Sequence, residues 1–440
     1  MSESKSECSV ELTAEQQNRG MRDVYIGASA GAILLMLLIR SAFGTLFVKH
    51  LGGSDRLAML LGAIIGFARL LQIPVSLRVH PSSGKKFLLR CWLAYGIIML
   101  AAALLPSVMG AGEMTARAMV LTIFIGVIVA QCGSTFWFPM LLDIAPAEKR
   151  GRFIGKMRAC WSTAVFIAIV VSGLFLGKNP ETWQFQAVMV VGVGFVFLRN
   201  IFASRIPVAS KSLVDQDDFG DWKKHINSLL YRRDVIVFCL YFAMVGICIG
   251  FLGQPLVLYM KEMGFPTNEN MIVFGFATLG MILSLLVGGQ LVDRIGTKRV
   301  FLVAHIVLCV VCFAVVGVGM LPRSQARIVM PMALVLVGAA RAVGFLACTT
   351  QLFHLAPDRG RAFFLCLANI LVFAGPSVSM LTAAAILSFV PNGWFVSVGA
   401  MELNVFQFML AMSGAALLVI AVLLRFVKDI RPERIEMDAE

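Results

Sequence analysis

Twelve apolar segments, each long enough to cross a lipid bilayer as an α-helix, constrain the fold of this chain more than any other feature. A membrane helix needs about 20 apolar residues, and unbroken apolar runs of this length are typical of helices rather than of β-barrel strands. With 59% hydrophobic and 14% charged residues among 440, the composition excludes an ordinary soluble enzyme. The predicted spans are Val24–Val48, Leu57–Val75, Phe87–Leu105, Ala118–Leu142, Ala159–Leu176, Gln184–Phe202, Val235–Met260, Met271–Leu291, Val300–Leu321, Ile328–Phe353, Ala362–Phe389 and Phe406–Phe426.

The distribution of basic residues predicts how these spans are oriented. With the N-terminus inside, most of the 38 Lys and Arg residues fall in segments that face the cytoplasm, Arg158 and Arg199 among them. The net charge of +13 then suits an anionic lipid surface rather than nucleic acid. We therefore expect a multi-pass protein of the cell inner or plasma membrane, monomeric, embedded in the lipid bilayer, with both termini in the cytoplasm and no nucleic-acid partner.

The polar segments divide the chain into five parts. These are a cytoplasmic tail (1–23), a first six-helix bundle (24–202), a linker (203–234), a second six-helix bundle (235–426) and a C-terminal tail (427–440). The first 22 residues carry no short apolar core with a cleavage site, so we expect the first span to direct insertion. In the linker, apolar residues from Phe219 to Leu230 recur at helical spacing among Lys and Arg residues, which predicts an amphipathic helix on the inner leaflet.

The two halves resemble each other at a nearly constant offset. Lys49–Gly52 matches Lys261–Gly264, and Gly84–Lys86 matches Gly296–Lys298, both 212 residues apart. Further matches at similar offsets join Gly133 to Gly344, Pro146 to Pro357 and Arg150–Arg152 to Arg359–Arg361. Six spans repeated in the same orientation predict two pseudo-symmetric bundles that can rock about a central site. Such an arrangement is suited to carrying a solute across the membrane.

A motif between the eighth and ninth spans carries a family resemblance. The residues from Gly289 to Arg299 read G-Q-L-V-D-R-I-G-T-K-R, which resembles the cytoplasmic signature G-x-L-x-D-K/R-x-G-x-K/R-K/R of the major facilitator superfamily. The resemblance implies that family's all-helical fold and secondary transport by rocker-switch alternating access. The first-half copy departs from the pattern, with Pro81 in place of the acidic residue. A Gly-Pro motif in span five and an arginine in span four, typical of the drug–proton antiporters of the family, are also missing.

The same resemblance implies a latch at the cytoplasmic side. Asp293 should approach the start of the fifth span, near Lys156 and Arg158, and stabilise the inside-closed state, with Gly296 allowing the tight turn. Asp143, at the end of span four, should find Arg78, Lys85 or Lys86. Alternatively these charges anchor loops at the lipid headgroups. The other residues assigned to the latch are Arg294, Arg150 and Arg359.

Arginines inside the predicted spans suggest the type of cargo. Arg341 lies about 12 residues from either end of its span, roughly 18 Å from each membrane surface, and Arg40 lies in the first span. In the family, spans 1, 4, 7 and 10 line the central cavity. None of the 25 Asp and Glu residues falls inside a span, so positive charge in that cavity favours an organic anion. Other candidate substrate-binding residues are Gln131, Gln254, Thr350, Gln351 and Asn369, for which hydrogen bonds between helices are the alternative.

Three alternatives to an anion carrier remain open. The first is a proton-coupled carrier of a neutral solute or drug that uses His305, His354 or Glu402. The second is a membrane sensor that does not transport. The third is a membrane-embedded enzyme, which the sequence disfavours because no span carries clustered His or carboxylate residues. Cys309 and Cys312 have metal-site spacing but no second ligand pair, so we expect no metal and no cofactor.

Overall fold

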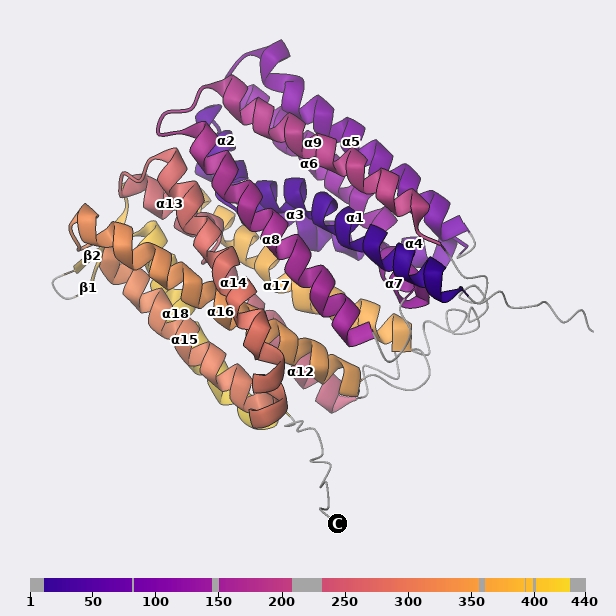
Figure 1. Cartoon of the computed structure of the whole chain (residues 1–440). Helices are drawn as coiled ribbons and strands as arrows, with labels where there is room; N and C mark the ends of the chain where they lie inside the picture. Colours follow the sequence, from indigo (N-terminus) through magenta and orange to yellow (C-terminus); the bar gives the residue numbers. More distant parts are fainter. Residues whose placement is uncertain are drawn as a thin grey trace, which may run out of the picture.

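The computed structural model describes residues 12–80, 83–144, 150–207, 232–355, 361–391, 393–398 and 401–427. Eleven helices of this part are long and apolar enough to cross a membrane. Helix α17 supplies the twelfth span, although its described apolar stretch, Ala374–Phe389, is shorter. The helices form two groups that lie side by side (Figure 1). The predicted fold class, an all-helical membrane protein built from two six-helix bundles, is confirmed.

The N half consists of the helices before residue 208 and the C half of the elements after residue 231. The N half contains α1 (Ala14–Arg40), α2 (Phe43–His50), α3 (Asp55–Leu70), α4 (Gln72–Arg78), α5 (Gly84–Met109), α6 (Glu113–Ser134), α7 (Trp137–Ile144), α8 (Arg150–Leu176) and α9 (Thr182–Arg205). The C half contains α12 (Arg233–Gly250), α13 (Gln254–Glu262), α14 (Thr267–Ile295), α15 (Thr297–Val318), α16 (Arg323–Leu355), α17 (Arg361–Phe389), β1 (Phe395–Val398), β2 (Met401–Asn404), α18 (Val405–Leu423) and the 3₁₀ turn η4 (Leu424–Phe426). The two strands pair as an antiparallel hairpin.

The first helix begins earlier than the apolar pattern indicated. Thr13 closes its N-terminus with a capping box, in which the Thr13 hydroxyl accepts from the Gln16 amide and the Gln16 side chain accepts from the Thr13 amide. The predicted boundary between residues 23 and 24 therefore falls inside α1, because a capped helix continues through its polar end. The amphipathic helix predicted in the linker lies outside the described residues.

The internal duplication of the sequence is also visible in the structure, at the helix ends that contain Gly52 and Gly264. Both glycines follow a short helix, α2 or α13, and both have positive φ, 85° and 79°. The amide after each glycine closes the helix end in the same way. Gly53 N donates to Val48 O at 2.9 Å, and Phe265 N donates to Met260 O at 3.0 Å. Only glycine adopts this backbone conformation without strain. The two halves thus repeat the same turn 212 residues apart.

The first and seventh spans are each broken into two helices at corresponding places. Between α1 and α2 the Ser41 hydroxyl donates to Leu37 O at 2.7 Å and accepts from Phe43 N at 3.1 Å. Between α12 and α13 the chain turns at Gly253, whose amide donates to Gly250 O at 2.9 Å. The breaks leave α2 and α13 together at one end of the molecule (Figure 1).

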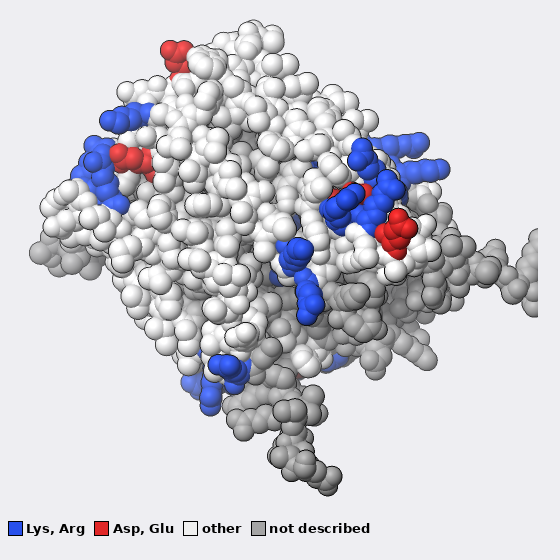
Figure 2. Space-filling view, viewed as in Figure 1, with Lys and Arg blue, Asp and Glu red and all other residues white. Residues whose placement is uncertain are grey.

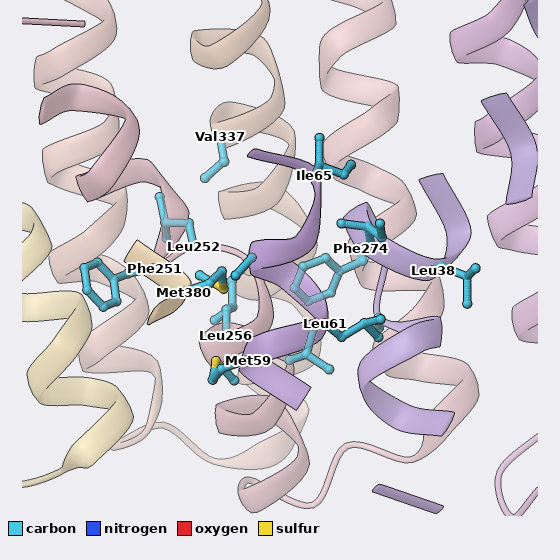
Figure 3. Packing of buried hydrophobic residues seen from close by; sticks show 14 of the residues in the cluster. Leu38, Met59, Leu61, Ile65, Phe251, Leu252, Leu256, Phe274, Val337 and Met380 are labelled. Atoms are coloured by element: carbon cyan, nitrogen blue, oxygen red, sulfur yellow. The ribbon is translucent and has the colours of Figure 1, made fainter. Parts of the chain in front are cut away.

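At this end, hydrogen bonds join the halves. Gln254 Nε2 donates to Ile39 O at 2.6 Å, and Asn268 N at the start of α14 donates to Gly177 O after α8 at 3.0 Å. We call this the closed end. Nearer the middle, Leu61 and Ile65 of α3 lie among Phe274 and other apolar side chains of the C half (Figure 3).

The outer surface suits a lipid environment. Charged side chains gather toward the ends of the helices, and most of the surface between them is uncharged (Figure 2). Leu286 of α14 and Val419 of α18 are among the most exposed large apolar residues. The ion pair of Arg327 with Glu269, at 2.7 Å, lies at the closed end. Since an apolar belt of this kind is stable only in contact with hydrocarbon, the surface supports a bilayer-spanning protein.

Glycines bring α14 and α16 into direct backbone contact. A Cβ atom on Gly280 would collide with Val335 O, and one on Gly338 would collide with Ala277 O. Small residues at a helix crossing allow this approach, which gives close packing where no hydrophobic driving force acts between helices. The contact fixes the position of Arg341, three residues after Gly338 on α16.

We expect Gly338→Ala to lower the stability of the protein in detergent by about 1–3 kcal/mol, because the added methyl group must push α16 away from α14. Gly194→Ala in α9 is the matched control, since a Cβ there meets nothing within 4 Å. That variant should be neutral or slightly more stable, as alanine favours a helix over glycine. Thermal unfolding measures both, and equal midpoints for the two variants would contradict the packing argument.

We expect Gln254→Leu to loosen the closed end, because it removes the hydrogen bond to Ile39 O and leaves a carbonyl short of a donor, at a cost of about 1–3 kcal/mol. Gln186→Leu is the control, since Gln186 bonds Ala103 O and Ser107 within the N half. A cysteine introduced at Ser377, in a background without other reactive cysteines, should react faster with a water-soluble maleimide in the Gln254 variant only. Equal rates in both variants would argue against a closing role.

Candidate functional site

A central cavity lies between the two halves. The two helix breaks form part of its wall. The cavity is partly open, and the empty space in it, open solvent included, is about 680 Å³. The N half contributes α1 and α3 to its walls, and the C half contributes α12, α13, α14, α16 and α17. Its lining residues are Ile39, Arg40, Ser41, Gly62, Ile65, Ile249, Gly250, Gly253, Gln254, Phe274, Arg341, Pro376, Ser377 and Met380.

Arg40 reaches this cavity because α1 ends there. It is the last residue of the helix before the break at Ser41, and its side chain is exposed although it lies in the interior of a span. A helix C-terminus carries partial negative charge from its unpaired carbonyl groups, which favours a cation at this position. The break thus places a guanidinium group at the cavity wall.

Arg341 reaches the same cavity from the C half. It lies in the middle of α16 and its side chain is half-buried. The charges of Arg341 and Arg40 repel each other. Among the residues that the structure describes, no hydrogen bond or ion pair engages either guanidinium group, and the cavity lining contains no Asp or Glu. The cavity is therefore positively charged, with donor groups free to bind a ligand.

The polar groups beside the arginines are mostly engaged in holding the halves. Gln254 donates to Ile39 O and lies against Gly62, where a Cβ would come within 2.7 Å of the amide carbon. Ser377 Oγ accepts from Gly66 N at 3.0 Å, again from one half to the other. Phe274 and Met380 supply apolar wall. The lining thus offers arginine to the charge of a small solute and apolar side chains to its carbon skeleton.

Three other predicted binding residues lie outside the cavity lining. Gln131 accepts from Gln72 Nε2 at 3.2 Å inside the N half, and Gln351 Oε1 accepts from Thr297 Oγ1 at 2.8 Å inside the C half. Thr350 donates to Leu346 O of its own helix at 3.2 Å. The side chain of Asn369 lies outside the described part. The first two are engaged in hydrogen bonds between helices, the alternative that the sequence left open.

The structure describes the turn of the predicted latch, but only one of its charged side chains. Gly296 has φ +81° and joins α14 directly to α15, the conformation for which glycine is suited. Arg294 is exposed. The side chains of Asp293, Asp143 and Arg150 and the whole of Arg359 lie outside the described residues.

Of the basic residues expected near the two latch carboxylates, two have other contacts. Lys85 Nζ donates to Ser204 O at 2.8 Å and to Ile206 O at 2.6 Å, at the end of α9. Lys156 Nζ lies 5.2 Å from the centre of the Tyr25 ring. Both contacts hold the ends of the N-half helices together.

Two arginines that the sequence analysis counted with the cytoplasm-facing segments lie within helices. Arg158 belongs to α8, and its Cζ lies 4.9 Å from the centre of the Phe345 ring of α16. Arg199 belongs to α9 and stacks on Trp92 at 3.4 Å, in space that Gly31 leaves open. Arg158 precedes the predicted span Ala159–Leu176, and α8 includes it because this helix begins earlier, at Arg150. Arg199 lies inside the predicted span Gln184–Phe202, although it was counted with the segments that face the cytoplasm. No local signal in the sequence marks either contact.

Neither histidine named for proton coupling lines the cavity, and His354 is exposed near the end of α16. His305 is buried inside the C half, where Nδ1 lies 2.7 Å from Phe301 O and the ring stacks on Tyr241 with centroids 5.5 Å apart. Glu402 lies in β2 of the hairpin. Within the described residues no group of three or more His, Cys, Asp or Glu side chains could hold a metal ion, and Cys312 Sγ contacts Ser413.

Solved structures of transporters share this architecture. A variant of the nucleoside transporter NupG superposes with a TM-score of 0.69 at 13% identity, covering 92% of this chain and 99% of its own. The xylose transporter XylE from E. coli, in an inward-open conformation, has a TM-score of 0.65 at 14% identity, covering 96% and 97%. A bacterial homologue of the iron transporter ferroportin has a TM-score of 0.61 at 15% identity, covering 94% and 99%. At these identities the likeness shows the fold alone.

The sequence itself supplies the family. No curated protein matches the chain significantly in sequence. The profile of the Major Facilitator Superfamily, however, matches residues 25–380, which include both helix breaks and every cavity residue. Together with the two six-helix bundles and the cavity between them, this match makes the protein a secondary membrane transporter, not an enzyme, that works by alternating access. The chain belongs to the Major Facilitator Superfamily.

Proposed function

We propose that the transported solute is a small organic anion bound between Arg40 and Arg341. The observation that carries this proposal is the pair of guanidinium groups, one from each half, that face a common cavity without an acidic partner among the described residues. A charge inside a membrane protein is costly and normally has a counter-charge or a function. The bound anion would supply the counter-charge for these two arginines.

The chemistry of arginine narrows the class of anion. A guanidinium group presents planar pairs of N–H donors that match the two oxygens of a carboxylate or a phosphate. Two such groups on opposite walls suit a solute with more than one anionic oxygen, such as a small dicarboxylate or a phosphate ester. The apolar side chains of Phe274 and Met380 would contact its carbon skeleton.

The helix breaks suggest how access alternates. The closed end, held by Gln254 and by α2 and α13, would face the outside under the predicted topology, with both termini in the cytoplasm of a monomer in the inner or plasma membrane. Rocking of the halves would then separate Gln254 from Ile39 and expose the cavity to that side. The predicted latch at Asp293 would close the opposite end.

Proton-coupled transport of a neutral solute is the second candidate. One solved structure with the same fold is described as a D-xylose-proton symporter, so this mode of transport is a natural alternative to anion transport. Proton coupling in a membrane span uses a titratable group that faces the cavity. None of the described lining residues is Asp, Glu or His. The anion carrier therefore agrees better with the cavity. A sensor that binds the anion without moving it would show binding and no flux.

We expect Arg341→Gln to raise the thermal stability of the ligand-free protein and to weaken anion binding about 10–100-fold. Stability rises because the substitution removes one of two repelling cations, and binding falls because charge-assisted hydrogen bonds are lost. A thermal-shift screen of succinate, inorganic phosphate and glycerol phosphate against the neutral solutes xylose and uridine measures both effects, since a specific ligand raises apparent stability.

Arg327→Gln is the matched control for this experiment. Arg327 lies on the same helix but is paired with Glu269 at the closed end, at 2.7 Å and 3.0 Å. This variant should lose some stability and keep the response to anions. If xylose or uridine stabilises the unsubstituted protein and none of the anions does, the proposed cargo is wrong.

A further inference from the structure

A third arginine lies between the halves, beyond the cavity lining. Arg158 of α8 places its Cζ 4.9 Å from the centre of the Phe345 ring of α16, so the contact joins the N half to the C half. Both side chains are partly exposed. Within the described part of the chain no hydrogen bond or ion pair engages the Arg158 guanidinium group.

The position of Arg158 follows from that of Arg341. Phe345 comes four residues after Arg341 on α16, so the two share one face of the helix and are about 6 Å apart along its axis. Arg158 therefore lies about one helical turn beyond the cavity, toward the end where α8 begins and α16 ends. This face of α16 leads from the cavity wall at Arg341 toward the end opposite the closed end.

Some other basic side chains in the described part of the chain have the polar partners that Arg158 lacks. Lys49 pairs with Asp55 at 2.6 Å, and Lys85 donates to two backbone carbonyl groups. Contact with an aromatic ring stabilises the arginine cation through the ring face. It uses no N–H group. The donors of Arg158 thus remain free for carboxylate or phosphate oxygens.

We propose that Arg158, positioned by Phe345, forms a second anion-binding site on the path between the central cavity and the end opposite the closed end. The proposal rests on the proposed function, since it assigns the same class of ligand, small carboxylates or phosphate esters. An anion that leaves Arg341 meets a new pair of donors one turn further on. Arg158 therefore acts on the rate of passage rather than on affinity at the central site.

The predicted latch gives Arg158 a different role, as a partner of Asp293. In that role Arg158 stabilises one conformation through a carboxylate of the protein itself, and Asp293→Asn has the same effect as removal of the arginine. In the proposed role Asp293→Asn leaves the dependence on Arg158 in place. The two roles are therefore separable by comparing the two variants.

The test measures exchange and binding on the same proteins. Purified variants are reconstituted in liposomes, and exchange of radiolabelled succinate or inorganic phosphate is followed beside a thermal-shift titration with the same anion. We expect Arg158→Gln to slow exchange about 10-fold or more, the effect of losing a charge-assisted hydrogen bond, with the dissociation constant changed less than about 3-fold. Arg158→Lys should restore part of the rate, because it keeps the charge without the planar donor pair.

Two further variants keep the test decisive. Phe345→Leu keeps an apolar side chain on α16 and should slow exchange in the same direction, because Arg158 loses the ring that positions it. Arg152→Gln removes an exposed charge from the same helix and should leave exchange unchanged. An unchanged exchange rate in Arg158→Gln, with anion binding intact, overturns the second site and leaves the central site standing.

Two other outcomes also decide the question. If Asp293→Asn slows exchange as much as Arg158→Gln, and the double variant is no slower than either, the latch explains Arg158 and the proposal fails. If neither succinate nor phosphate stabilises or crosses with the unsubstituted protein, the anion function itself fails for these probes, and the second site falls with it.

Discussion

The requirement that buried polar groups find partners inside a bilayer governs the arrangement of this protein. Broken helices leave backbone amides and carbonyls without their usual partners, so membrane proteins tolerate such breaks where they are buried in protein or line a wet cavity. Ser41 and Gly253, at the two breaks, both line the central cavity. The helix breaks therefore account both for the cavity between the halves and for the position of the Arg40 cation at the end of α1.

The duplicated scaffold carries a charge distribution that is not duplicated. The turns at Gly52 and Gly264 and the breaks before α2 and α13 repeat between the halves. At the same offset of 212, however, Arg40 corresponds to Leu252. Each half thus contributes one arginine from a different span, α1 in one and α16 in the other. A solute held between them is bound asymmetrically, although the framework that moves it is symmetric.

Hydropathy and spacing could predict the part of this structure that depends on whole spans. The twelve spans, the duplication and the placement of Arg40 and Arg341 inside the membrane followed from segments averaged over many residues. The helix breaks were not predicted, because Ser41 and Gly253 lie inside segments whose average hydropathy is that of a single continuous span. The contacts of Arg158 and Arg199 were not predicted either. Helix α8 begins before the apolar segment and so includes Arg158, and the rings of Phe345 and Trp92 that contact Arg158 and Arg199 come from distant spans.

The division of the two cavity arginines between the halves links binding to motion in the proposed anion carrier. Any movement that narrows the cavity brings Arg40 of the N half nearer to Arg341 of the C half, and their repulsion grows as water leaves. An anion between them converts this repulsion into two attractions. The loaded carrier then crosses the occluded state more readily than the empty one, because only the loaded cavity is electrically balanced. Such a carrier favours exchange of one anion for another over return with an empty site.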